Sequence, residues 1–100
     1  MPLPSLEFSA ELQSTFIEEG FDPAYFVILP EAIAAEIAAQ TAGSGRAFGS
    51  VKVSVSIGRS SWNTTLLRRD GRYVLPIRKP VRVAEGLREG ERVAVTISVL

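Results

Sequence analysis

The feature that most constrains the fold is a strict alternation of apolar and polar residues near the C-terminal end of the chain. Apolar side chains occupy every second position there, at Val93, Val95, Ile97 and Val99. A period of two is that of a β-strand with one buried face. Gly86 and Gly90 precede this stretch, and glycine lets a chain turn at low steric cost. We therefore predict a closing strand that begins at a glycine-marked corner.

Five further segments have the length and the pattern of strands. They are Leu6 to Phe16, Tyr25 to Leu29, Ser50 to Gly58, Trp62 to Leu66, and Tyr73 to Ile77. The last two are separated by Asp70-Gly71, a pair that favours a two-residue hairpin turn because both residues tolerate positive φ. Pro76 lies inside the last segment and predicts a sheet edge or a bulge. Trp62 shares the parity of Leu66, so we expect it in the core.

One α-helix is predicted, at about residues 30–41. Pro30 suits the first turn of a helix, where its missing N–H has no intrahelical partner, and Glu31 suits the positive end of the helix dipole. The residues that follow are mostly strong helix formers, with Ile33 and Ile37 four positions apart. The helix should therefore bury one narrow face.

Six strands, one helix and frequent turns predict a mainly β fold. We expect a small six-stranded β-barrel, closed or nearly closed, with one α-helix. Val81 to Leu87 leaves room for one further helical turn. A parallel arrangement would need a helix after each strand, and only one is predicted. The 100 residues suit a single domain that spans positions 1–100.

The chain contains neither cysteine nor histidine, which restricts its chemistry. Disulfides and the usual pairs of nucleophile and general base are excluded, and a transition metal would find only carboxylate ligands. We predict no catalytic residue, no metal ligand and no cofactor. The sequence shows no secretory signal and no run of 18 apolar residues, so we expect a cytoplasmic protein without a membrane partner.

Charge is distributed unevenly along the chain, although the formal net charge is zero. All eleven lysines and arginines lie from Arg46 onwards, whereas acidic residues dominate before it. The favoured interpretation is that the acidic and basic halves fold against each other, in pairs that stabilise little when exposed. The alternative is a basic surface for an anionic partner.

Six basic residues between positions 68 and 82 form the candidate binding surface. They are Arg68, Arg69, Arg72, Arg78, Lys79 and Arg82. The first three flank the predicted hairpin turn, where a solvated tip is the plainer interpretation. Guanidinium groups nevertheless suit phosphate, so an anion or a nucleic acid is an alternative ligand. The zero net charge argues against nucleic acid, because modules that bind it usually carry a basic excess.

The order and spacing of several segments resemble the bacterial family known as domain of unknown function 1905. The resemblance extends from about Leu6 to Val99. It rests on Phe26–Pro30, Gly49–Val53, Trp62–Leu66, Asp70–Ile77, Val81–Leu87 and Gly90–Val95. It implies a small β-barrel and carries no established catalytic residues. The corner from Gly86 to Glu91 also resembles the turn before the last strand of swapped-hairpin transcription factors, which bind DNA as dimers.

These observations favour a non-catalytic binding or protein-interaction module. The partner is unknown, and a protein is favoured over a nucleic acid. A regulator-like module that binds nucleic acid or another anion through the surface at 68–82 is the alternative. An enzyme with an unrecognised site is the second alternative, restricted to chemistry of Tyr, Ser, Glu or Lys.

Overall fold

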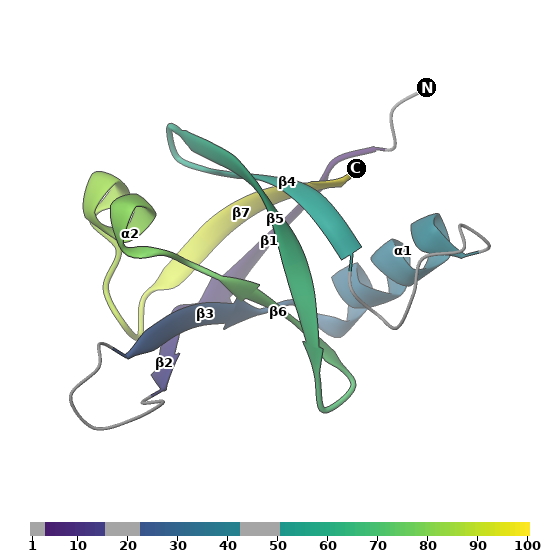
Figure 1. Cartoon of the computed structure of the whole chain (residues 1–100), viewed down its shortest axis with the longest axis horizontal. Coiled ribbons are helices and arrows are strands. Elements are labelled where there is room, and N and C mark those ends of the chain that lie inside the picture. Colours follow the sequence, from purple (N-terminus) through teal and green to yellow (C-terminus); the bar gives the residue numbers. More distant parts are fainter. Residues whose placement is uncertain (1–3, 16–22, 43–50) are drawn as a thin grey trace.

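The structure, a computed structural model, describes residues 4–15, 23–42 and 51–100. They form one seven-stranded antiparallel sheet, curled into an open half-barrel, and two helices (Figure 1). The strand order is β1-β7-β4-β5-β6-β3-β2. The strands are β1 (Leu6–Glu11), β2 (Gln13–Thr15), β3 (Ala24–Ile28), β4 (Val51–Ile57), β5 (Ser60–Arg69), β6 (Arg72–Pro76) and β7 (Arg92–Val99). The helices are α1 (Glu31–Thr41) and α2 (Lys79–Glu85).

The curl of the sheet follows from its two end strands, β1 and β2, which only Leu12 separates along the chain. The Leu12 N–H donates to the Glu91 carbonyl at 2.8 Å, and its carbonyl accepts from the Gly90 N–H at 2.8 Å. From Gln13 onwards the chain pairs with β3 instead. Because the two ends of the strand order meet at one residue, the sheet bends round, and the Leu12 side chain is fully buried inside it.

The prediction of a mainly β fold is confirmed. The sheet is an open half-barrel of seven strands with two helices, however, and not the predicted closed or nearly closed barrel of six strands with one helix. The first predicted strand is two strands, because the chain exchanges β7 for β3 as its partner at Leu12. The helical turn expected within Val81 to Leu87 is the seven-residue helix α2, which begins at Lys79. Pro80 lies in its first turn, a position that suits proline. Phe16 and Ser50, the outer ends of two predicted strands, lie outside the described residues.

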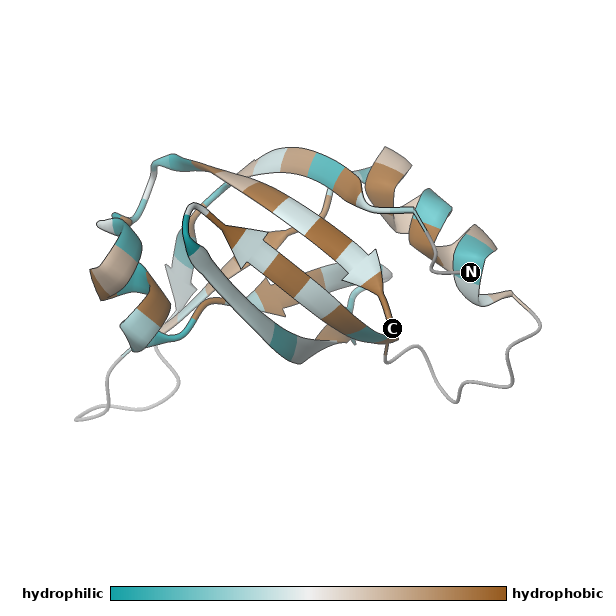
Figure 2. Ribbon diagram, turned by 90° about the horizontal axis from the view of Figure 1, so that it is seen from above, coloured by the Kyte–Doolittle hydropathy of each residue, from teal (hydrophilic) through white to brown (hydrophobic). Residues whose placement is uncertain are grey.

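Apolar and polar side chains alternate along β4 and β7, as the sequence predicts, and the apolar ones form the centre of the core. Val53 and Val55 on β4 are fully buried, and Ile97 on β7 is 1% exposed. Figure 2 shows the same alternation as bands of opposite hydropathy along neighbouring strands. Burying one such side chain contributes about 1.5–3 kcal/mol, so these two strands supply much of the stability.

Helix α1 covers part of the sheet through one narrow apolar face. Ile37 is fully buried and Ile33 packs partly against the core, whereas Glu36 is exposed. The helix contacts β6 and β7, which confirms the predicted helix and its buried face. Neither described helix is long and apolar enough to cross a membrane.

The turn between β5 and β6 has the geometry that the sequence predicts. Asp70 and Gly71 have φ values of 51° and 76°, and the residues on either side, Arg69 and Arg72, pair across the ladder. Both loop residues are therefore left-handed, as a two-residue hairpin of this kind requires.

Two side chains lie differently from expectation. Pro76 was expected at an edge or a bulge, but β6 lies inside the sheet, and Pro76 is its last residue. Ile77 donates its N–H to Tyr25 on β3, so the nitrogen of Pro76 faces the β5 side, beyond the last β5–β6 pair. Its missing N–H therefore costs no ladder bond. Trp62 packs against the core but is only partly buried.

Candidate binding surfaces

The six predicted binding residues lie in two groups at opposite ends of β6 (Figure 1). Arg68, Arg69 and Arg72 lie at the β5–β6 turn, and the other three lie at and within α2. Strand β6 has five residues, which at about 3.3 Å per residue correspond to about 16 Å of chain between the groups. The structure therefore does not bring the six residues together on one continuous surface.

The first group belongs to a projecting segment, residues Leu67–Arg72, which we call the hairpin tip. Among the described residues, β4 pairs with β5 only as far as Leu66, and β3 pairs with β6 only as far as Val74. The tip therefore extends beyond the described ends of β4 and of the β3–β6 ladder. Leu67 is 45% exposed there. All three arginines of the tip are exposed as well.

The exposure of Leu67 was missed by sequence reasoning, although the sequence contains a signal for it. Leu66 and Leu67 are consecutive in a strand, so their side chains must point to opposite faces of the sheet. Leu66 is fully buried. Leu67 therefore faces outwards with Arg69 and Arg72, whereas Arg68 lies on the opposite face, over the Tyr73 ring.

The arginines of the hairpin tip have no carboxylate partner. In the part of the chain that the structure describes, no ion pair within 4.0 Å joins a lysine or arginine to an aspartate or glutamate. Arg68 lies over the ring of the buried Tyr73, with its guanidinium carbon 5.6 Å from the ring centroid. Across the described residues, the acidic and basic halves of the chain are thus not joined by ion pairs.

The second group lies at α2 and is dominated by a stacked arginine. The guanidinium carbon of Arg82 is 3.7 Å from the centroid of the Tyr25 ring, and its Nε is buried without a hydrogen-bond partner. Arg78 and Lys79 are exposed at the start of the helix. A shallow pocket next to Arg82 is lined by Arg82, Val83, Gly86, Leu87 and Arg88. Sequence reasoning missed Tyr25 and Arg88, because the contacts that involve them depend on the tertiary fold.

Acidic side chains near α2 bind elsewhere in the molecule. The Glu85 carboxylate accepts hydrogen bonds from the Ser60 hydroxyl at 2.6 Å and from the Arg59 N–H at 3.3 Å. The Ser14 hydroxyl donates to the Glu89 carboxylate. Both carboxylates therefore fasten α2 and the following loop to other strands.

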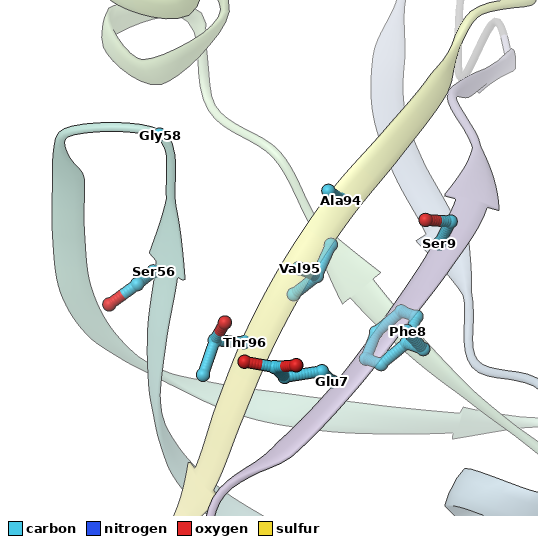
Figure 3. A pocket seen from close by; sticks show the side chains of 8 residues that line it. All are labelled: Glu7, Phe8, Ser9, Ser56, Gly58, Ala94, Val95 and Thr96. Atoms are coloured by element: carbon cyan, nitrogen blue, oxygen red, sulfur yellow. The ribbon is translucent and has the colours of Figure 1, made fainter.

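A further pocket lies on the outer face of β1, β7 and β4 (Figure 3). It carries the hydroxyls of Ser9, Ser56 and Thr96 beside the Glu7 carboxylate. No hydrogen bond within this pocket joins Glu7 to one of these hydroxyls, so no nucleophile there has an activating base. Over the same described ranges, no three acidic side chains are grouped to hold a metal ion.

Comparison with known proteins places the chain in a family. None of the curated proteins matches the sequence. A family model described as Domain of unknown function (DUF1905) matches residues 8–97. This range extends from the middle of β1 to the middle of β7 and includes both candidate binding groups. The chain therefore belongs to the DUF1905 family.

Proposed function

We propose that the chain is a non-catalytic module that binds an acidic protein surface through its hairpin tip. The observation that supports this proposal is the combination, on a projecting turn, of a half-exposed leucine and three arginines that have no carboxylate partner among the described residues. A single exposed leucine is ordinary on its own. On the face of Leu67, however, Arg69 and Arg72 add charge and hydrogen-bond donors, and arginine is enriched at protein interfaces.

The projecting geometry also favours a protein partner. The tip extends past β4 and β3 in the described chain, so a partner can contact both faces of the two-stranded turn. Its arginines offer planar forks for carboxylates, and Leu67 offers apolar area that binding would remove from water. An acidic surface with an apolar patch is complementary to both features.

A nucleic acid or another anion remains the second candidate ligand. The free guanidinium groups of the tip support it, because such groups bind phosphate well. Two observations weigh against it. The net charge of the chain is zero. The two basic groups are separated by the length of β6, so they form no continuous path for a phosphate backbone.

An enzymatic role has weaker support than either binding role. The outer pocket of Figure 3 contains three hydroxyls and a carboxylate, but the carboxylate makes no hydrogen bond to them. General-base activation needs that contact or a bridging water.

The test is fluorescence anisotropy with a labelled peptide rich in glutamate and leucine, at 50 mM salt. We expect the Arg68/Arg69/Arg72→Ala variant to lose binding and Leu67→Ser to weaken it at least about fivefold. Burial of the exposed part of one leucine is worth about 1 kcal/mol or more, which corresponds to that factor. Light scattering of each variant checks that the changes do not arise from aggregation.

Two matched variants serve as controls. Arg59→Ala removes an exposed arginine at the β4–β5 turn, and Val83→Ser removes an apolar side chain that is 70% exposed on α2. Neither should change peptide binding. If Leu67→Ser bound the peptide as tightly as the wild type, the proposed apolar contact would be wrong. If all the variants bound alike, the hairpin tip would not be the binding site.

A further inference from the structure

We propose a second binding site, independent of the hairpin tip, that holds the phosphate group of a small molecule. The site is the shallow pocket beside α2, of about 280 Å³, lined by Arg82, Val83, Gly86, Leu87 and Arg88. We call it the α2 pocket. Its proposed ligand-binding groups are the guanidiniums of Arg82 and Arg88.

Arg82 is held in place by an interaction that uses none of its hydrogen-bond donors. Its guanidinium carbon lies over the Tyr25 ring, 3.7 Å from the centroid. No side-chain donor of Arg82 has a hydrogen-bond partner in the described chain, and its Nε is buried. The Nε is covered by protein atoms, so the donors that a ligand can reach are the terminal nitrogens of this partly exposed side chain. A stacked arginine with free donors is already oriented to receive an oxyanion.

The lining of the α2 pocket includes two cations and no carboxylate. Glu85 and Glu89 lie next to it in the chain and keep their negative charge, but their carboxylates accept hydrogen bonds from residues outside the pocket. Glu85 binds Ser60 and the Arg59 N–H on the β4–β5 turn, and Glu89 binds Ser14. Arg88 lines the pocket and makes no ion pair with a described carboxylate.

Two further cations extend this positive surface along α2. Arg78 is the residue that precedes the first turn of α2, and its carbonyl accepts the Arg82 N–H at 3.1 Å. Lys79 lies beside Arg78, and both side chains are exposed. Four neighbouring cations favour a dianion over a singly charged carboxylate. A phosphate monoester at neutral pH has that charge.

The helix end beside the pocket is partly capped. The C-terminal end of a helix normally presents unpaired carbonyls, which repel negative charge. In α2 the Arg82 carbonyl accepts from the Leu87 N–H at 2.9 Å, and the Val83 carbonyl accepts from the Gly86 N–H at 3.3 Å. Gly86 has a φ of +63°, and a Cβ there would meet nothing within 4 Å. The pocket is therefore open above Gly86, and two of the last four carbonyls of α2 are occupied.

The test is an NMR titration of the ¹⁵N-labelled chain, at constant ionic strength, with inorganic phosphate and separately with glycerol 2-phosphate. We expect saturable shifts at the amides of Gly86, Leu87 and Arg88, with a Kd of about 1 mM or tighter for at least one ligand. Tighter binding of glycerol 2-phosphate would identify a phosphate monoester as the ligand. Tighter binding of inorganic phosphate would identify free phosphate.

Three variants locate the site. Arg88→Gln and Arg82→Lys should each weaken binding at least about tenfold, because each removes a guanidinium fork. Arg69→Gln is the matched control, since it removes the same charge from the hairpin tip and should leave the titration unchanged. Arg88 is exposed, so Arg88→Gln stays informative even if Arg82→Lys unfolds.

The proposal is overturned if the shifts rise linearly without saturation, if sodium chloride reproduces them, or if Arg69→Gln weakens binding as much as Arg88→Gln. The peptide assay reports on the hairpin tip, and the phosphate titration reports on the α2 pocket. Arg88→Gln should leave peptide binding intact. Loss of phosphate binding and loss of peptide binding therefore report on different sites.

Discussion

The hydroxyl of Ser60, at the start of β5, donates a 2.6 Å hydrogen bond to the carboxylate of Glu85, on the last turn of α2. The same carboxylate accepts the N–H of Arg59 at 3.3 Å. These two hydrogen bonds attach helix α2 to the β4–β5 turn. Ser60 lies 25 residues before Glu85 in the chain. The contact fixes the orientation of the helix that carries Arg82, and it also explains the glycine at position 58.

Gly58→Ala should destabilise the chain more than Gly71→Ala. Both glycines have positive φ, +56° and +76°, so alanine costs about 1–2 kcal/mol at either position. At Gly58 the added Cβ would also meet the Glu85 carboxylate, whereas at Gly71 it would meet nothing within 4 Å. Thermal denaturation of the two variants measures the difference.

A double-mutant cycle identifies the cause of that difference. In a Glu85→Ala background the carboxylate is absent, so Gly58→Ala should cost no more than Gly71→Ala does. An equal cost of Gly58→Ala in both backgrounds would mean that the Glu85 contact does not constrain the turn.

Ser60→Ala should lower the free energy of unfolding by about 1–2 kcal/mol, because it leaves a partly buried carboxylate without its hydroxyl donor. Ser61→Ala is the control. Ser61 makes only an exposed hydroxyl contact with Ser56 at 3.1 Å, so its loss should cost clearly less. Urea denaturation at neutral pH measures both. Equal costs would contradict the special role of Ser60.

Gly71→Val should destabilise the chain by at least about 1 kcal/mol, since a β-branched residue is strained at a φ of +76°. The side chain would have free space around it, so the effect is conformational strain and not a clash. The melting temperature reports it. An unchanged value would mean that the β5–β6 turn tolerates another geometry.

Ile97→Ala should cost about 2–5 kcal/mol, because Ile97 is 1% exposed at the centre of β7 and its truncation leaves a cavity. Thr96→Ala is the matched control on the opposite face and should have a mild effect. Chemical denaturation of both variants checks the parity of this strand. If the two variants lost similar stability, the inner and outer faces of β7 would be assigned incorrectly.

Local patterns were sufficient to predict much of the fold. The alternation in 51–57 and 93–99 predicted both the strands and their buried faces. Asp70-Gly71 predicted the hairpin because both residues take positive φ there. Helix α1 followed from its composition and from the spacing of its isoleucines. Each of these features is encoded within a few residues of the chain.

Features that depend on distant partners were not predictable in the same way. The break at Leu12 arises where the chain exchanges one strand partner for another, and no residue near it signals that exchange. Pro76 was misjudged because its tolerance depends on where β5 stops pairing with β6. The six basic residues were predicted as one surface. Their division into two groups depends on the direction of β6, which brings 68–72 and 78–82 to its opposite ends.

The central claim is that the hairpin tip binds protein and not nucleic acid. The most direct measurement is fluorescence anisotropy of the wild-type chain at 50 mM salt, with labelled single-stranded DNA, double-stranded DNA and RNA beside the acidic peptide. We expect saturable peptide binding, and no nucleic-acid binding tighter than about 100 μM, the weak end of ordinary non-specific affinity. The claim is contradicted if nucleic acid binds more tightly than the peptide and if this binding weakens steeply between about 50 and 200 mM salt. In that case the slope of log K against log salt concentration should also fall by about one for each tip arginine removed.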